Sequence, residues 1–536
     1  MVELIGIEPK RSGEGADRPD WRLLPSAAAP DRCVTAASAH VVAGHQAPRA
    51  VGREIEVQVG IEPHPAQLGD HGLDARGGVD ETDDDLTRSD GGDVRHRSKW
   101  SFRWPDTCLA ISRLHALQSA AMGADLLHPR FALRALTEAL ADTPVVLIHG
   151  PRQCGKTTLA LAIAESRGHA YFSFDDAVAL GAATTDPVGF VADLPEHCIL
   201  DEVQRVPALF TAIKAAVDRG RRPGRFLLTG SANVLLLPKL ADSLAGRMEL
   251  LRLHPLAQCE LARRAPGFLD ALFEGRFEAR DYGRLGRELA ERIAAGGYPA
   301  ALARATPRRR AIWYRDYIET LVQRDVRDLS HIGALDALPR LLALAAGQTA
   351  RLLNVSDLAA PFQLSRPTIR DYLTLLERLF LVEPLAPWHS NRLSRLIKTP
   401  KLHLGDTGVA CALLGLDAES LWRDRGTLGQ LLETFVYQEL RRQTSWCDDD
   451  IRFHHFRDKD GVEVELVLER GGRELAGGEV KASATVTAAD FRGLRKLRDA
   501  AGKRFAAGVV LYDGEVSVGC GERLFAVPVR ALWELE

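Results

Sequence analysis

The 536-residue sequence has no long apolar run and no paired cysteines. No apolar stretch approaches the roughly 18 residues that a membrane-spanning helix requires, so we expect no membrane segment. The eight cysteines are scattered, with neither a Cys-x-x-Cys pair nor a zinc-ligand spacing, which argues against a disulfide scaffold or a zinc finger. Such cysteines suit a reducing compartment, where thiols pack as small apolar groups, and we therefore expect a cytoplasmic protein.

An excess of charge of either sign is also missing. The formal net charge is −3, so any basic surface for nucleic acid must be local. The content of 46% apolar and 26% charged residues is that of a globular protein. The length predicts about three domains.

Residues 1–121 have little apolar periodicity. They are rich in Gly, Asp, Arg, Pro and His and contain the acidic run 80–85. Such a composition buries too little apolar surface to offset chain entropy, which predicts disorder. Periodic sequence begins just after Met122, one of only three methionines. Our hypothesis is that Met122 is the true start and that 1–121 is a mis-called extension; the alternative is a genuine disordered tail.

A phosphate-binding loop is predicted after the apolar run Val145–His149. The run leads into Gly-x-x-x-x-Gly-Lys-Thr, and an alanine- and leucine-rich helix follows. Glycines let such a loop curl with its N–H groups inward, the helix N-terminus favours an anion, and the lysine reaches the β- and γ-phosphates. The predicted nucleotide-binding residues are Gly150, Pro151, Arg152, Gln153, Cys154, Gly155, Lys156, Thr157 and Thr158.

An acid pair, Asp201-Glu202, ends the apolar strand that begins at Cys198. Opposite a phosphate-binding loop, Asp201 and Thr157 would hold Mg²⁺, and Glu202 would activate the attacking water. Further strands are predicted at 171–174, 225–232 and 248–253, and helices between them indicate a parallel sheet. Thr229 and Ser231 either sense the γ-phosphate or serve ordinary turn chemistry.

These residues resemble the AAA+ ATPases, and in particular a bacterial and archaeal group of ATP-binding proteins with a C-terminal domain of unknown function. The strings that carry the resemblance are Gly150–Thr157, Ile199–Gln204, Leu228–Asn233 and Ser243–Arg247. The resemblance implies ATP as the nucleotide, and it leaves a homo-oligomer open because such ATPases usually assemble. It also implies that Arg247 is a catalytic arginine finger that reaches the ATP of a neighbouring copy, with Arg324 and Arg327 as rivals; a solvated helix face is the alternative for each.

A helical lid is predicted over 291–345, and a small helical unit over 346–390 looks like a winged helix-turn-helix. Ser365 would cap its second helix and Pro367 would lie in the first turn. Arginines on this helix could meet phosphates, but neighbouring acids dilute their charge, so we favour a structural or protein-contact role over specific DNA reading. The arginines are Arg366, Arg370 and Arg378 and the acids Asp371 and Glu377.

Acidic residues recur in the last predicted unit, residues 391–536. Glu463 and Glu465 would share one face of a strand, and Glu479 and Lys481 one face of another. Together with Glu433 they predict a hard-cation site in which a lysine positions water. An acid followed further along the chain by Glu-x-Lys resembles the PD-(D/E)xK nuclease-like fold. Glu465 departs from the family pattern, which more often has Asp there, and this puts cleavage activity in doubt. The alternative is a solvated sheet edge.

The predicted fold class is therefore α/β. An AAA+-like P-loop NTPase parallel sheet over 122–290 is followed by the helical lid, the winged-helix unit and the C-terminal nuclease-like domain. The predicted function is Mg²⁺-dependent ATP binding and hydrolysis that acts on DNA through the C-terminal domain. The alternative is a nucleotide-controlled switch whose C-terminal domain is not catalytic and holds a protein partner.

Overall fold

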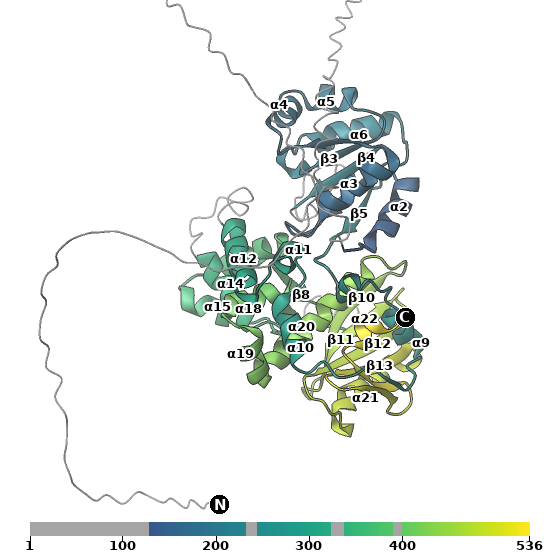
Figure 1. Cartoon of the computed structure of the whole chain (residues 1–536), viewed down its shortest axis with the longest axis vertical. Coiled ribbons are helices and arrows are strands. Elements are labelled where there is room, and N and C mark those ends of the chain that lie inside the picture. Colours follow the sequence, from purple (N-terminus) through teal and green to yellow (C-terminus); the bar gives the residue numbers. More distant parts are fainter. Residues whose placement is uncertain (1–127, 232–243, 323–336, 390–398) are drawn as a thin grey trace, which may run out of the picture. The chain divides into compact units, whose positions relative to one another are not determined.

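The computed structural model describes residues 128–231, 244–322, 337–389 and 399–536. The first part of the fold is a five-stranded parallel sheet with strand order β2-β3-β4-β1-β5 (Figure 1). The strands are β1 (Val145–His149), β2 (Ala170–Ser173), β3 (Cys198–Asp201), β4 (Phe226–Gly230) and β5 (Met248–Arg252). All five predicted strands therefore form, with ends shifted by one or two residues. The predicted extension 1–121 and the start at Met122 lie outside the described residues.

Helices cover both faces of this sheet, and the first four residues of β1 are apolar. Val145 and Leu147 belong to the core on one face, and Val146 and Ile148 to the core on the other, as the two-residue period of a strand requires. The first face is covered by α4 (Ala177–Thr185), α5 (Pro187–Asp193) and α6 (Leu209–Arg219), and the second by α2 (Ala132–Asp142) and α3 (Lys156–Arg167).

The middle of the chain is mostly helical. Its helices are α8 (Gln258–Ala262), α9 (Phe268–Glu274), α10 (Arg287–Ala295), α11 (Pro299–Leu302), α12 (Pro307–Thr320) and α14 (Ala337–Gly347). The predicted lid thus contains α12 and α14, whereas Arg324 and Arg327 lie outside the described residues.

Two helices follow in the predicted helix-turn-helix, α15 (Val355–Ala359) and α16 (Arg366–Arg378). Ser365 caps α16 by accepting from the Thr368 backbone N–H at 3.2 Å, and Pro367 lies in the first turn, so both sequence predictions are confirmed. An antiparallel sheet in the order β7-β9-β8 accompanies these helices. Its strands are β7 (Arg351–Leu352), β8 (Val382–Leu385) and β9 (Lys401–Leu404). The winged-helix interpretation stays a prediction.

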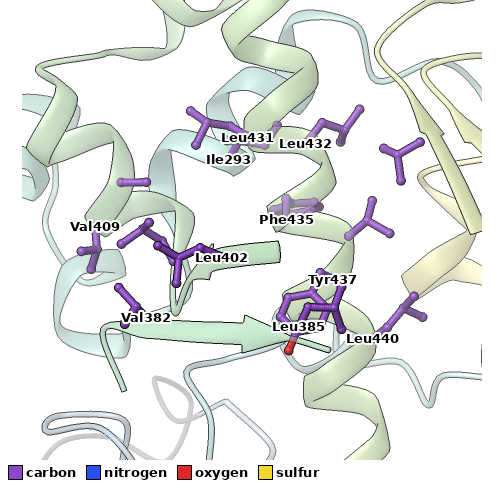
Figure 2. Close-up of a cluster of buried hydrophobic side chains, with 14 of the residues drawn as sticks. Ile293, Val382, Leu385, Leu402, Val409, Leu431, Leu432, Phe435, Tyr437 and Leu440 are labelled. Carbon is purple, nitrogen blue, oxygen red and sulfur yellow. The ribbon is translucent and has the colours of Figure 1, made fainter. Parts of the chain in front are cut away.

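One apolar cluster joins this small sheet to helices that precede it and helices that follow it in the sequence. Figure 2 shows Val382, Leu385 and Leu402 close to side chains of the long helix α20 (Arg425–Thr444), among them Leu431 and Phe435. All of these side chains are almost fully buried. The helices that follow β9 are α18 (Thr407–Leu414), α19 (Ala418–Arg423) and α20.

The C-terminal part contains a seven-stranded mixed sheet with strand order β10-β11-β12-β13-β15-β14-β6. Its strands are β6 (Arg280–Asp281), β10 (Ile451–Arg457), β11 (Glu463–Arg470), β12 (Glu474–Lys481), β13 (Phe505–Tyr512), β14 (Val516–Gly519) and β15 (Leu524–Pro528). Its helices are α21 (Arg492–Ala501) and α22 (Ala531–Glu534). The two strands that carry the predicted acids form as expected.

The edge strand β6 comes from far earlier in the sequence than its neighbours. It pairs with β14 through Asp281 and Val516. The nearby chain is tied to the same region, because Arg284 forms an ion pair with Asp513 and the Gly267 N–H donates to the Leu535 carbonyl at 2.7 Å. Sequence reasoning placed residues 280–281 in the ATPase core, since a two-residue strand carries no detectable periodicity.

Within the described ranges, no helix is both long enough and apolar enough to cross a membrane.

Candidate functional site

The predicted phosphate-binding loop connects β1 to α3. Gly155 is the N-cap of α3 and has φ of 100°, a left-handed conformation that a side chain would strain. At the other end of the loop, a Cβ on Gly150 would overlap the Leu253 carbonyl oxygen. Both glycines are therefore required by the backbone path, as the motif predicted.

Lys156 begins α3 and is 5% exposed. Its ammonium donates to the carbonyl oxygens of Gly150 at 3.1 Å and Pro151 at 2.8 Å. The amine thus lies inside the curl of the loop, next to the backbone N–H groups at the start of α3. A concave loop with one enclosed cation fits the polyphosphate of a nucleotide.

Arg130 also holds the phosphate-binding loop, through contacts that the sequence motif does not reveal. Its guanidinium donates to the carbonyl oxygens of Cys154 at 2.9 Å and His254 at 2.6 Å. The same group forms an ion pair with the fully buried Glu260 at 3.1 Å. Arg130 therefore connects the phosphate-binding loop to the chain that follows β5, and sequence separation concealed this contact.

Asp201 lies at the carboxyl end of β3, and 3% of its surface is exposed. It accepts hydrogen bonds from the hydroxyls of Thr157 at 3.1 Å and Tyr171 at 2.7 Å, and from the Thr229 hydroxyl. Burial raises the pKa of Asp201, and the three hydroxyl donors oppose this rise by stabilising the charged form. The predicted metal pair, Thr157 and Asp201, is thus in direct contact.

Glu202 follows at once, in a left-handed conformation with φ of 59°. Its backbone N–H donates to the Thr229 hydroxyl at 3.1 Å, and its carboxylate accepts from the Ser231 hydroxyl at 3.1 Å and from the Gln204 amide. Thr229 and Ser231 therefore orient the acid pair, and γ-phosphate sensing by them stays a prediction. Gln204 is an addition to the predicted site.

Tyr171 is a second addition, because parallel pairing of β2 and β3 sets Ser173 opposite Asp201 and brings the Tyr171 hydroxyl to the carboxylate. We expect Tyr171→Phe to raise the Mg²⁺ concentration for half-maximal ATP hydrolysis by roughly tenfold, since a hydrogen bond to a charged group contributes about 1.5–3 kcal/mol. A Mg²⁺ titration at constant ATP measures this effect. Tyr372→Phe on α16 is the matched control, and equal behaviour of the two variants would contradict the assignment.

Arg247 precedes β5, whose first residue Met248 pairs with Val145. It therefore lies at the amino-terminal edge of the sheet, opposite the phosphate-binding loop of its own chain. Its Nε forms an ion pair with Asp218 at 2.6 Å. This position excludes action on the chain's own nucleotide and leaves only a neighbouring copy, so the arginine-finger role stays a prediction.

The predicted C-terminal acids do converge. The Lys481 ammonium lies 3.4 Å from Glu465 Oε1 and 3.3 Å from Glu479 Oε2. Burial raises the pKa of Glu479, and the adjacent Glu465 carboxylate raises it further. Glu433 faces the same cluster from α20.

The hard-cation site expected from these acids stays a prediction. In the part of the chain that the structure describes, no group of three or more His, Cys, Asp or Glu side chains is arranged to hold a metal ion. A second lysine, which sequence reasoning missed, also reaches the cluster. The Lys401 ammonium forms an ion pair with Glu433 at 2.7 Å and lies 3.9 Å from Glu463.

On α16, the second helix of the predicted helix-turn-helix, Arg366 and Arg370 are exposed and Arg378 is half-buried. Asp371 is exposed beside them, so the mixture of charges expected from the sequence is present on the surface. The structural or protein-contact role that the sequence favours for this helix over DNA reading stays a prediction.

Comparisons with known proteins divide the chain into three matched segments. Residues 142–262 match a family model described as an AAA domain. Residues 286–420 and 428–532 match two models that are each described as a domain of unknown function (DUF8612 and DUF4143). The first segment is therefore an AAA-type ATP-binding domain with a P-loop NTPase fold.

Two mycobacterial proteins resemble a larger part of the chain. They are the uncharacterized proteins Mb2031c of Mycobacterium bovis and Rv2008c of Mycobacterium tuberculosis, each 29% identical over 405 residues, which is 75% of this chain and 84% of the relative. Among solved structures, the Walker-type ATPase PabY2304 of Pyrococcus abyssi matches with a TM-score of 0.32 and 16% identity. That match covers 52% of this chain and 94% of the other.

Proposed function

We propose that this chain binds and hydrolyses ATP with Mg²⁺ and uses the cycle to act on DNA through its C-terminal domain. The observation that supports hydrolysis most directly is the contact between Thr157 and Asp201 beside the enclosed Lys156. It joins the end of the phosphate-binding loop to the end of β3, which is where a metal-bound triphosphate needs oxygen ligands.

Each residue then has a distinct task. Lys156 exchanges its bonds to loop carbonyls for β- and γ-phosphate oxygens, and Thr157 and Asp201 supply oxygen ligands. A bound Mg²⁺ would neutralise charge on the phosphates. Glu202 accepts a proton from the attacking water, while Ser231 and Gln204 fix the direction of its carboxylate.

Arg247 is proposed to act in trans. Its guanidinium sits at the edge of the sheet opposite its own loop, so it reaches an ATP only if a second copy places that ATP next to it. Asp218 would hold the side chain in an extended position before assembly. This proposal requires a homo-oligomer.

The alternative is a nucleotide-controlled switch whose C-terminal domain holds a protein partner. The ion pair between Lys401 and Glu433 favours this version, because it fills part of the cluster that would otherwise serve cleavage. DNA and a protein partner therefore remain two targets for the same ATPase.

The first experiment measures ATP hydrolysis by the full chain with and without double-stranded DNA. We expect hydrolysis in the wild type, stimulation by DNA, and a fall of about 10²–10³-fold in Lys156→Ala, the usual cost of removing one preorganised charge donor. Lys214→Ala, on α6 at the other face of the sheet, is the matched control. A rate of ATP hydrolysis that is the same with and without DNA would favour the protein-partner alternative. No hydrolysis at all would leave only a nucleotide-binding switch.

A further inference from the structure

The acidic cluster of the C-terminal part contains four glutamates and two lysines, from four separate elements. Their exposed side-chain fractions are 13% for Glu433, 35% for Glu463, 17% for Glu465, 7% for Glu479, 4% for Lys401 and 30% for Lys481. A carboxylate this buried is either paired with a cation or protonated, because an unpaired buried charge costs several kcal/mol. The question is which cation the fold provides.

Lys401 supplies that cation from outside the sheet. It is the first residue of β9, where it pairs with Leu385 of β8 and Leu352 of β7, so its backbone position is determined by a three-stranded sheet. Its ammonium lies 2.7 Å from Glu433 Oε1 and 3.9 Å from Glu463 Oε2.

The other carboxylates are occupied as well. Glu465 is 3.4 Å from the Lys481 ammonium and accepts the Val480 backbone N–H at 3.3 Å. Glu479 lies against α21, where a Cβ at position 493 would overlap its Oε1, so Gly493 is needed for the helix to approach. The cluster is therefore closed by protein groups on the side of α21.

A divalent metal would need a different environment. Mg²⁺ requires near-octahedral oxygen ligands at about 2.1 Å and usually keeps several waters. Placed between Glu433 and Glu465 it would lie beside the Lys401 ammonium, and the two positive charges would repel each other in a region with little water to screen them.

We propose that the Lys401 ammonium occupies the place of a divalent metal in this cluster, so that the C-terminal domain folds and works without one. The domain then binds its target without metal-dependent cleavage of it. This inference does not rest on ATP hydrolysis, and its test is independent of nucleotide.

The test uses the full chain carrying Asp201→Asn, which removes the metal ligand of the ATP site, without nucleotide. The probe is Mn²⁺, followed by electron paramagnetic resonance and by the thermal midpoint Tm. The parent should take up no Mn²⁺ at the cluster, so adding Glu465→Gln should leave Mn²⁺ uptake unchanged. If the parent instead binds one equivalent of Mn²⁺ and Glu465→Gln abolishes that binding, the proposal is overturned. This comparison needs no variant of Lys401.

Adding Lys401→Met to the same parent keeps most of the side-chain volume and removes the charge. We expect the Tm to fall by roughly 10 °C, as for a broken buried ion pair, with about one Mn²⁺ bound per chain and much of the lost Tm restored by it. Adding Glu433→Gln to Lys401→Met should recover Tm without Mn²⁺, because the unpaired charge is gone. A Lys401→Met variant that is stable and indifferent to Mn²⁺ would overturn the proposal.

Discussion

Replacement of Glu202 by Gln is expected to lower kcat for ATP hydrolysis by about 10²–10⁴-fold, the range that general-base catalysis contributes. ATP affinity should stay within a few-fold, because Gln keeps the size of the side chain and Lys156 and the loop are untouched. The reason is specific to the geometry. Glu202 is held by Ser231 and Gln204 at the end of β3, next to the Thr157–Asp201 contact, and its carboxylate is the group that we propose accepts a proton from water.

The measurement is single-turnover hydrolysis together with equilibrium ATP binding. Glu165→Gln, an exposed glutamate near the end of α3, is the matched control and should match the wild type in both. Loss of ATP binding in Glu202→Gln would show a structural role instead. A kcat within a few-fold of wild type would show that another group accepts the proton.

The largest expected loss of stability comes from Asp406→Ala. Asp406 is 1% exposed and forms an ion pair with Arg442 at 3.0 Å, and it also accepts the backbone N–H groups of Gly297 at 2.8 Å and Gly408 at 2.9 Å. Arg442 is 3% exposed, so the substitution leaves a buried cation with one partner fewer. Breaking such a pair costs about 3–5 kcal/mol, and loss of the helix cap on α18 adds about 1 kcal/mol.

Chemical denaturation followed by circular dichroism tests this prediction. Asp448→Ala is the control, because Asp448 forms an ion pair of similar length with Arg134 but is 76% exposed, where such a pair contributes less than about 1 kcal/mol. Equal losses in the two variants would mean that burial is not what gives the Asp406 pair its strength.

Sequence reasoning found the parts of the ATP site that are local in the chain. Lys156, Thr157 and the acid pair are recognisable because a strand, a glycine loop and a helix must follow one another within a few residues. Arg130, Tyr171 and Gln204 were missed, because their contacts depend on strand register and on how the chain returns after β5. No spacing rule reports such contacts.

The C-terminal cluster also contains a contact that sequence spacing could not predict. Alternation along β11 and β12 correctly predicted that Glu465, Glu479 and Lys481 face each other. It also suggested a metal, since three carboxylates and one lysine have a surplus of negative charge. Lys401 lies 62 positions before Glu463 on a strand of another sheet, so the neutralising charge could be found only in three dimensions.

The strand β6 has a consequence for how the protein is made. Its partner β14, together with Asp513 and Leu535, is synthesised more than 200 residues later. In a nascent chain, residues 267–286 are therefore exposed to solvent until residues 513–535 have left the ribosome and this sheet can close. Termination of synthesis before residue 513 would leave that early segment without its partner and make it a recognition site for chaperones and proteases.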